Sequence, residues 1–183
     1  MCGRYFLERD ISDAALLRIL ETLEAREEGA KICGDIFPTD RAPALADGRI
    51  LSMRWGFACP GARAVINARS ETAQEKAMFR GAGRCLLPAS GYYEWGGEQK
   101  RRYAFARPGG AIYMAGLWRR EADGEKRFVI LTREATAKAA RVHARMPVLF
   151  DGELRRAWLD ARNPLPELLR AAVDDVSIVE RKS

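Results

Sequence analysis

Residues 85–132 read CLLPASGYYEWGGEQKRRYAFARPGGAIYMAGLWRREADGEKRFVILT, and this stretch decides the fold. It contains successive runs rich in β-branched, aromatic and apolar residues, which are typical of strands. The turn formers Gly96-Gly97, Pro108-Gly109-Gly110 and Asp123-Gly124 separate the later runs. The stretch therefore predicts strands in hairpin-like succession, at residues 85–87, 91–95, 103–106, 111–118 and 127–132.

Helices and shorter strands are expected on both sides of this stretch. Residues 12–28 predict an amphipathic helix that Ser12 or Asp13 can cap, with an apolar stripe of Leu16, Ile19, Leu20 and Leu23. Thr72 and Glu75 predict a capping box for a helix to about Phe79. Two prolines predict an irregular loop over residues 35–43. Further strands are expected at 50–57, 65–67 and 176–180, and helices at 134–142, 152–160 and 164–173.

Strands in succession with helices around them indicate an α+β fold. We expect a largely antiparallel, barrel-like sheet with short peripheral helices. The 183 residues can bury a sizeable core, and no repeat, low-complexity segment or linker divides them. The sequence therefore predicts one domain over residues 1–183, acting as a monomer.

The composition indicates an ordinary globular chain, with 48% hydrophobic and 31% charged residues. No stretch approaches the roughly 20 apolar residues of a membrane helix, and the N-terminal residues lack a secretory layout. We expect a cytoplasmic protein, nucleoid-associated if bacterial, with no membrane partner. The formal net charge of +6 suits a polyanionic partner, although many basic proteins bind no nucleic acid.

The four cysteines are widely spaced, and His143 is the single histidine. This pattern argues against a tetrahedral zinc site and against a disulfide framework in an intracellular chain. No metal or other cofactor is expected. Cys33, Cys59 and Cys85 are interpreted as small buried hydrophobes.

Cys2 follows the initiator Met1 directly, and removal of Met1 would leave Cys2 with a free α-amine. The unperturbed pKa values are about 8 for the amine and about 8.5 for the thiol, so both are partly deprotonated near neutrality. Both groups can add to one aldehyde carbon, as an imine and then as a five-membered thiazolidine ring. The alternative is an unremarkable Cys in a loose terminus.

Three other segments carry candidate chemistry. Asn67 lies where a strand gives way to a helix and could orient a nucleophile or a sugar oxygen, and Arg69 would suit a phosphate. Strand alternation places Glu94 on the face of Tyr92, where partial desolvation would raise its pKa. His143 is the only imidazole in the chain, and imidazole is the side-chain type best suited to acid–base work near neutral pH. Each has a plainer alternative, namely a helix entry, an ion-paired Glu and an ordinary His.

Aromatic residues alternate with arginines near these segments, a mixture that suits single-stranded nucleic acid. The same rings could equally belong to the core. The residues concerned are Tyr5, Trp55, Tyr93 and Trp95, with Arg4, Arg54, Arg69 and Arg145.

Together, four motifs resemble the SOS-response-associated peptidase (SRAP) family, the abasic-site processing proteins. They are MCGRY at the start, NARSET at 67–72, LLPASGYYEW at 86–95 and HARMP at 143–147. The resemblance implies a single SRAP domain that binds single-stranded DNA containing an abasic site and cross-links to it through a thiazolidine. It also implies an enzyme with thiol (auto)peptidase and lyase-type activity.

The same resemblance implies roles for individual residues. Cys2 would supply the amine and thiol, and Asn67 would orient a nucleophile or a sugar oxygen. Glu94 would be the acid–base residue, and His143 would transfer protons. The implied DNA contacts are phosphates at Arg4, Arg69 and Arg145, and bases at Trp55 and Trp95.

One segment departs from the family pattern. Where the family has an Asn-x-Ala-Pro-Thr-like loop, this chain has Asp35-Ile36-Phe37-Pro38-Thr39, and a negative charge at Asp35 would oppose a nearby phosphate. Two other functions stay open. One is a cysteine peptidase using Cys2, His143 and Asn67, in its simplest form removing only Met1. The other is a single-strand binding module without a covalent step.

Overall fold

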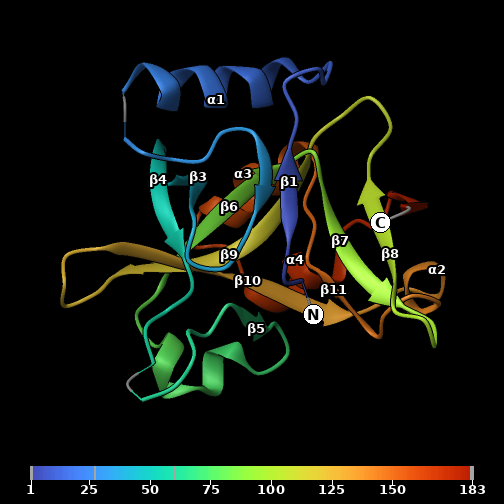
Figure 1. Cartoon of the computed structure of the whole chain (residues 1–183). Helices are drawn as coiled ribbons and strands as arrows, with labels where there is room; N and C mark the ends of the chain where they lie inside the picture. Colours follow the sequence, from blue (N-terminus) through green and yellow to red (C-terminus); the bar gives the residue numbers. More distant parts are fainter. Residues whose placement is uncertain (1, 27, 60, 182–183) are drawn as a thin grey trace.

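The computed structural model describes residues 2–26, 28–59 and 61–181, and its strands form two sheets (Figure 1). The smaller sheet contains, in spatial order, β12 (Ser177–Arg181), β8 (Arg101–Ala106), β7 (Gly91–Gly96), β1 (Tyr5–Leu7) and β2 (Gly34–Ile36). The larger sheet contains β11 (Arg145–Pro147), β10 (Lys126–Glu134), β4 (Arg49–Trp55), β3 (Arg41–Ala46), β6 (Gly83–Ala89) and β9 (Ile112–Arg120), with β5 (Asn67–Arg69) beside β10.

Strand pairing is largely antiparallel, as the sequence predicts. β10 runs parallel to β4 and to β5, and the other pairings between described strands are antiparallel. The pairings lead from β10 through β4, β3, β6 and β9 back to β10, so the larger sheet curls on itself. β3 and β6 share only the pair Leu45 with Leu86, so the sheet is barrel-like and not a closed barrel. The predicted α+β class is confirmed.

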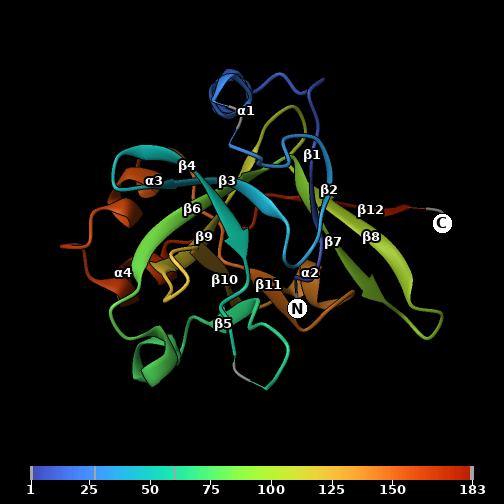
Figure 2. The same ribbon diagram turned by 60° about the vertical axis from the view of Figure 1, so that its left-hand side comes forward.

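The first helix forms for the reasons that its sequence suggests. α1 (Ala14–Ala25) begins after Asp13, whose carboxylate accepts a hydrogen bond from the Leu16 N–H over 2.9 Å. Its stripe of Leu16, Ile19, Leu20 and Leu23 is buried, each side chain contributing about 1.5–3 kcal/mol. Figure 1 shows α1 lengthwise along one end of the molecule and Figure 2 shows it end-on there, and it contacts β3 and β4 of the larger sheet. The helix is shorter than predicted, and residue 27 lies outside the described residues.

The other predicted elements are present with shifted ends. Strands cover 85–87, 91–95, 103–106, 111–118 and 127–132 almost entirely, and β12 occupies the last predicted strand. The predicted strand at 65–67 forms later, as β5, and Val65 makes only an isolated bridge to Phe57. The later helices are α2 (Ala137–Ala140), α3 (Gly152–Leu159) and α4 (Leu165–Arg170).

The predicted loop over 35–43 is confirmed only for residues 37–40, because β2 and the first half of β3 occupy the rest. Pro43 pairs with Ser52 of β4. The neighbouring strand β6 pairs with β3 only at Leu45. Pro43 therefore has no partner residue on β6, and the N–H group that proline lacks is not required for pairing on that side. This is the edge-like position in which a sheet tolerates proline.

The predicted helix from Thr72 to Phe79 is also wrong. Two short 3₁₀ turns replace it, η1 (Ala73–Glu75) and η2 (Ala77–Phe79), and the Thr72 side chain makes no capping bond. Lys76 between them has an extended backbone, with φ −83° and ψ 124°, which interrupts a helix. The break lets both turns direct an apolar side chain, Ala73 and Phe79, into the core.

The cysteine prediction holds only in part. Cys85 on β6 is buried, whereas Cys33 is exposed and Cys59 is half-buried. Cys33 immediately precedes β2 and Cys59 follows β4, so both lie in connecting segments, which run over protein surfaces.

Aromatic residues from both sheets meet in one continuous core. The Trp55 ring stacks on Phe128 at 6.2 Å and packs against Tyr5 of the smaller sheet at 5.2 Å. Within the described residues, no helix is long and apolar enough to cross a membrane.

Candidate functional site

Cys2 is held just before β1, between the two sheets. Strand β1 pairs on one side with β7 and on the other with β2, and this fixes the residues before it. The Cys2 side chain is fully buried, with Sγ 3.9 Å from the carbonyl oxygen of Arg4. Burial raises the pKa of the Cys2 thiol far above its ordinary value, and the nearby Glu94 raises it further. The thiol is therefore protonated at neutral pH in this arrangement.

Asn67 anchors the backbone of Cys2. It is the first residue of β5, which runs parallel to β10 with Asn67 opposite Ile130. The side-chain Nδ2 of Asn67 donates a hydrogen bond to the Cys2 carbonyl oxygen over 2.9 Å. A cavity of about 390 Å³ opens beside β5, lined by Asn67, Arg69 and Thr132 among others.

Further polar atoms are buried near Cys2. The Asn67 Oδ1 and the hydroxyl groups of Tyr5 and Tyr92 have no hydrogen-bond partner among the described residues. Both tyrosines interact electrostatically with Cys2. Buried polar atoms normally have partners, so the surroundings of Cys2 suit polar atoms better than an apolar ligand.

Glu94 is the buried carboxyl group of the site. It lies on β7 with 3% of its surface exposed, on the same face as the buried Tyr92. Desolvation raises the pKa of Glu94, while His143 acts in the opposite direction. The alternation predicted for this strand is confirmed, because Tyr93 and Trp95 lie on the more exposed face. A carboxyl group with a raised pKa can donate and accept protons closer to neutrality.

His143 lies close to Glu94, and Gly96 makes this packing possible. His143 lies between α2 and β11, and the backbone N–H of Arg145 donates a hydrogen bond to the His143 Nδ1 over 3.0 Å. A Cβ at Gly96, in the strand of Glu94, would come within 2.6 Å of the Val142 carbonyl oxygen. Gly96 therefore permits the segment with His143 to pack against β7. No sequence motif pointed to this role.

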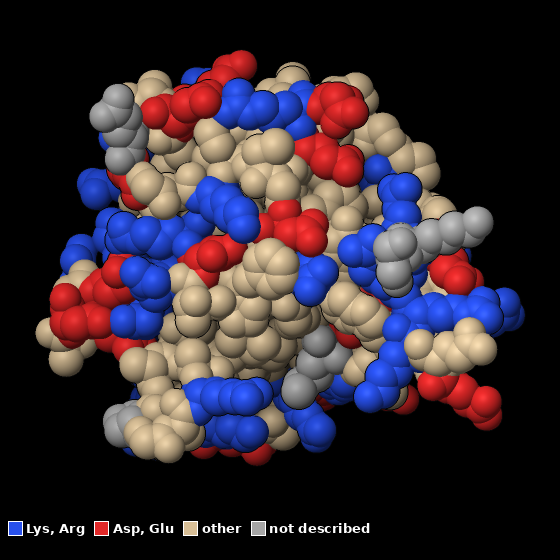
Figure 3. All heavy atoms as spheres, viewed as in Figure 1, with Lys and Arg blue, Asp and Glu red and all other residues tan. Residues whose placement is uncertain are grey.

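The Arg4 side chain lies on the face of the smaller sheet that carries Trp95. Its guanidinium carbon is 4.5 Å from the Phe37 ring centroid and 5.1 Å from that of Trp95. Both rings are among the exposed large hydrophobic side chains. On the face shown in Figure 3, Lys and Arg side chains surround a central uncharged area, interrupted by acidic ones.

The other predicted DNA contacts differ in availability. Arg69 is exposed on β5. Arg145 donates to both carboxylate oxygens of Glu71, over 2.7 and 2.8 Å, and to the Thr132 carbonyl oxygen. This pairing lowers the pKa of Glu71 to about 2. The sequence quoted Glu71 within a motif but did not identify it as the partner of Arg145.

Trp55 does not fit its predicted contact with DNA bases. Its ring has no exposed surface, and its Nε1 donates to the Ile66 carbonyl oxygen over 2.9 Å. The plainer alternative, a core aromatic residue, describes Trp55, because the residue is fully buried and its ring packs against both Phe128 and Tyr5.

The candidate site is thus formed from separate parts of the chain. Cys2, Asn67, Glu94 and His143 come from the segment before β1, from β5, from β7 and from the turn before β11. The Asn67 bond and the electrostatic interactions of Glu94 with Cys2 and His143 link all four. This arrangement combines a nucleophile, an orienting amide and two groups able to transfer protons.

The chain is similar in sequence to known proteins. The abasic site processing protein YobE of Bacillus subtilis (strain 168) is 29% identical over 143 residues, covering 69% of this chain. The match covers 65% of YobE, so the chain spans less than two thirds of that relative. The abasic site processing protein YoqW of the same strain is 29% identical over 198 residues, covering 93% of this chain and 85% of YoqW.

A solved structure shares the fold. A protein from Bacteroides thetaiotaomicron superimposes with a TM-score of 0.81 at 20% identity, covering 99% of this chain and 92% of the other. The family model of the SOS response associated peptidase (SRAP) matches residues 1–180. The chain therefore belongs to the SOS response associated peptidase family.

Proposed function

We propose that this protein processes abasic sites in single-stranded DNA by forming a covalent bond through Cys2. The observation that carries the proposal is the hydrogen bond of 2.9 Å from Asn67 to the Cys2 carbonyl, with Glu94 buried beside Cys2. Family membership and the names of the relatives YobE and YoqW support the general part of the proposal, abasic-site processing. The proposal requires removal of Met1, which lies outside the described residues, because an acylated Cys2 nitrogen cannot form an imine.

The reaction joins one aldehyde carbon to two atoms of Cys2. The amine adds to C1′ of the ring-opened sugar, and loss of one water molecule gives an imine. The thiol then adds to the imine carbon, its proton passes to the nitrogen, and a thiazolidine ring results. The product is DNA joined to protein, with one water released and no change in oxidation state.

Each neighbouring group has a role in these steps. Asn67 fixes the Cys2 backbone, so that the amine and thiol keep one orientation toward the sugar. Glu94 donates a proton when the sugar ring opens and when water leaves, which its raised pKa favours. His143, next to Glu94, transfers protons between this carboxyl group and the reacting atoms.

The side chains around the site supply the proposed contacts with DNA. Arg4 and Arg69 offer guanidinium groups to phosphates, and Trp95, with 37% of its surface exposed, offers a ring to a base. Arg145 can contact a phosphate only after it leaves Glu71. We omit Trp55 from the proposed interface because it is buried.

A general cysteine peptidase is less well supported. Such an enzyme begins with a thiolate activated by a lowered pKa, whereas burial and Glu94 raise the pKa of the Cys2 thiol. The proposed capture begins with the amine instead, and the thiol adds only afterwards, within the same residue. Removal of Met1 by the protein itself remains compatible with the proposal, because that reaction precedes capture.

The test is intact mass spectrometry of the purified protein, alone and after incubation with an oligonucleotide containing one abasic site. We expect protein lacking Met1, and an adduct equal to the sum of the two masses minus one water. Cys2→Ala should form no denaturation-resistant adduct but keep reversible binding. Cys2→Ser, which retains an oxygen nucleophile, should also fail to form a stable ring.

The alternatives give other results. A binding module without chemistry would form no adduct with the wild-type protein. A general peptidase would cleave added peptides whether or not DNA is present, and either result would contradict the proposal.

A further inference from the structure

The segment that departs from the family pattern lies directly beside Arg4. Strand β2 pairs with β1 so that Asp35 is opposite Phe6, which makes Arg4 and Asp35 diagonal neighbours on one face of the sheet. The Asp35 Oδ2 lies 3.5 Å from the Arg4 Nη1, with 33% and 28% of the two side chains exposed. The guanidinium group of Arg4, which the proposed function assigns to a phosphate of the DNA, is thus paired with the carboxylate of Asp35.

Arg4 is close to the reacting residue. Its carbonyl oxygen lies 3.9 Å from the Cys2 Sγ and also accepts the Tyr93 N–H over 2.9 Å. Its guanidinium group lies between the rings of Phe37 and Trp95. Arg4 is only two positions after Cys2 in the chain. A DNA phosphate bound by Arg4 would therefore keep the DNA close to Cys2.

Hydrogen bonds within and around the segment after β2 fix the position of Asp35. Asp40, at the far end of the same segment, accepts the Phe37 N–H over 2.9 Å and the Lys31 ammonium over 3.2 Å. The Thr39 N–H donates to the Trp55 carbonyl oxygen over 2.9 Å. These bonds hold the segment after β2 against the core, and Phe37 in turn lies over Arg4.

A carboxylate and a phosphate compete for the same guanidinium group, because both are oxyanions that accept its N–H bonds. The Arg4–Asp35 pair is partly exposed, so a phosphate can displace the carboxylate. After displacement, the negative charge of Asp35 stays close to the strand and repels it.

We propose that Asp35 is a specificity-determining residue that weakens reversible binding of intact single strands by competing for Arg4. The inference rests on the proposed function, since it assigns Arg4 to DNA. Its consequence is selectivity: intact DNA leaves the site readily, and an abasic strand is retained because it becomes covalently bound.

The first experiment measures reversible binding alone. In a Cys2→Ala background, fluorescence anisotropy with an undamaged single-stranded oligonucleotide is recorded over a range of salt concentrations. Asp35→Asn should bind roughly three- to ten-fold more tightly, and its log–log salt slope should steepen by about 0.7, the value for one more phosphate contact. Asp47→Asn, at the turn between β3 and β4, makes the same change in net charge and should alter neither quantity appreciably.

The second experiment asks whether Asp35 acts through Arg4. The gain from Asp35→Asn should shrink at least two-fold when Arg4 is replaced by Gln. With Cys2 intact, excess undamaged strand should inhibit adduct formation by Asp35→Asn more strongly than by the wild type.

The outcomes separate the inference from the function on which it rests. Equal affinities for Asp35→Asn and Asp47→Asn, or a gain undiminished without Arg4, would overturn the role of Asp35 even if the wild type forms adducts. Tighter binding by Asp35→Asn in a protein that forms no adduct would uphold the competition and overturn the covalent function. Absence of DNA binding by every variant would overturn both.

Discussion

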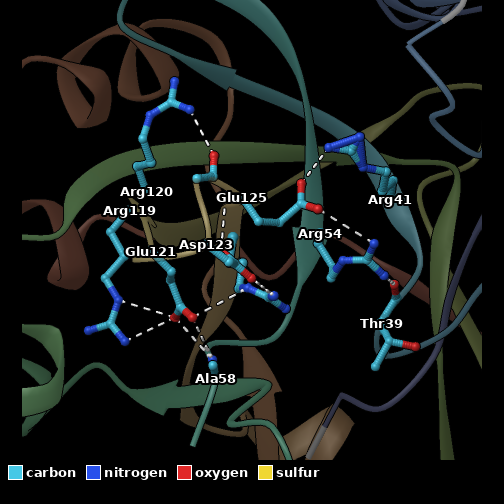
Figure 4. A network of polar contacts seen from close by, with 11 residues as sticks. Thr39, Arg41, Arg54, Ala58, Arg119, Arg120, Glu121, Asp123 and Glu125 are labelled. Atoms are coloured by element: carbon cyan, nitrogen blue, oxygen red, sulfur yellow. Dashed lines mark hydrogen bonds and ion pairs between the residues drawn. The ribbon is translucent and has the colours of Figure 1, made fainter.

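Two glutamates in different regions show how surroundings decide what a carboxyl group does. Glu94, on β7, has 3% of its surface exposed, and Glu121, after β9, has 9% of its side chain exposed. Glu121 forms ion pairs with Arg119 at 3.0 Å and with Arg127 at 3.3 Å. The Ala58 N–H also donates a hydrogen bond to its carboxylate over 3.0 Å (Figure 4). For Glu94, desolvation is the largest influence, and it raises the pKa.

The Glu121 carboxylate belongs to a wider charged network. In the same region Glu125 pairs with Arg41 and Arg54, and Asp123 pairs with Arg127 at 2.6 Å (Figure 4). Charges matched in this way stabilise one another. Burial alone therefore does not mark a catalytic carboxylate; the balance between desolvation and nearby cations does.

The largest expected effect is on the reaction itself. Replacing Glu94 by Gln should slow adduct formation by about 10²–10⁴-fold, because an amide cannot transfer protons. Glu121→Gln should react at nearly the wild-type rate. The measurement is the rate at which a denaturation-resistant adduct appears on a gel. A Glu94→Gln rate within three-fold of wild type would remove Glu94 from the mechanism.

The pH dependence of the same reaction sharpens this test. A raised pKa keeps Glu94 protonated above its ordinary range. Acid assistance is therefore present below the raised pKa and declines as the pH rises through it. Glu94→Gln should lack that decline, and a persistent decline would assign it to another group.

The second effect is on stability and concerns Glu121. Glu121→Gln should lower the free energy of unfolding by about 1–3 kcal/mol, because the partly buried guanidinium group of Arg119 loses its paired carboxylate and that of Arg127 keeps only Asp123. Urea unfolding measures it. Glu153→Gln is the control, since that side chain is 93% exposed and pairs only across a helix turn, so its effect should stay within about 0.5 kcal/mol. Equal losses of stability in Glu121→Gln and Glu153→Gln would refute the distinction between the largely buried carboxylate and the exposed one.

A smaller effect is expected at Asn67. Asn67→Ala removes the hydrogen bond to the Cys2 carbonyl, and the rate of adduct formation should fall about ten-fold, equivalent to roughly 1.4 kcal/mol. Asn163→Ala is a matched control, because Asn163 makes a similar bond of 2.9 Å to the Ala157 carbonyl oxygen near α3. It should reduce stability but not rate. An equal loss of rate in both variants would indicate a general effect of destabilisation.

The smallest effect concerns Glu71 and depends on pH. Its pKa is lowered to about 2 by Arg145, from an ordinary 4.5. The stabilising contribution is thus present above pH 4.5 and is lost as the pH falls toward 2. Because 46% of the Glu71 side chain is exposed, it should be less than about 1 kcal/mol. Unfolding of Glu71→Gln and wild type should differ at pH 7 and converge in acid, whereas a pH-independent difference would exclude the ion pair as the cause.

Local sequence patterns predicted most of the regular structure. The stripe of α1 and the strands between residues 85 and 132 follow from periodicity and turn residues, which act over a few positions. The errors occurred where long-range packing overrides local preference. Pro43 is accepted in β3 because β6 meets that strand only at Leu45, and the chain from Thr72 to Phe79 breaks into two turns so that both reach the core.

The sequence by itself determined the family, through motifs whose order and spacing are distinctive, and it named the four residues of the candidate site. Only the tertiary structure decided how those residues are used. Whether Trp55 is core or surface, which acid pairs with Arg4, and how Gly96 admits His143 all depend on contacts between segments far apart in the chain. A side chain's exposure and charge partners arise from packing, and no local pattern encodes them.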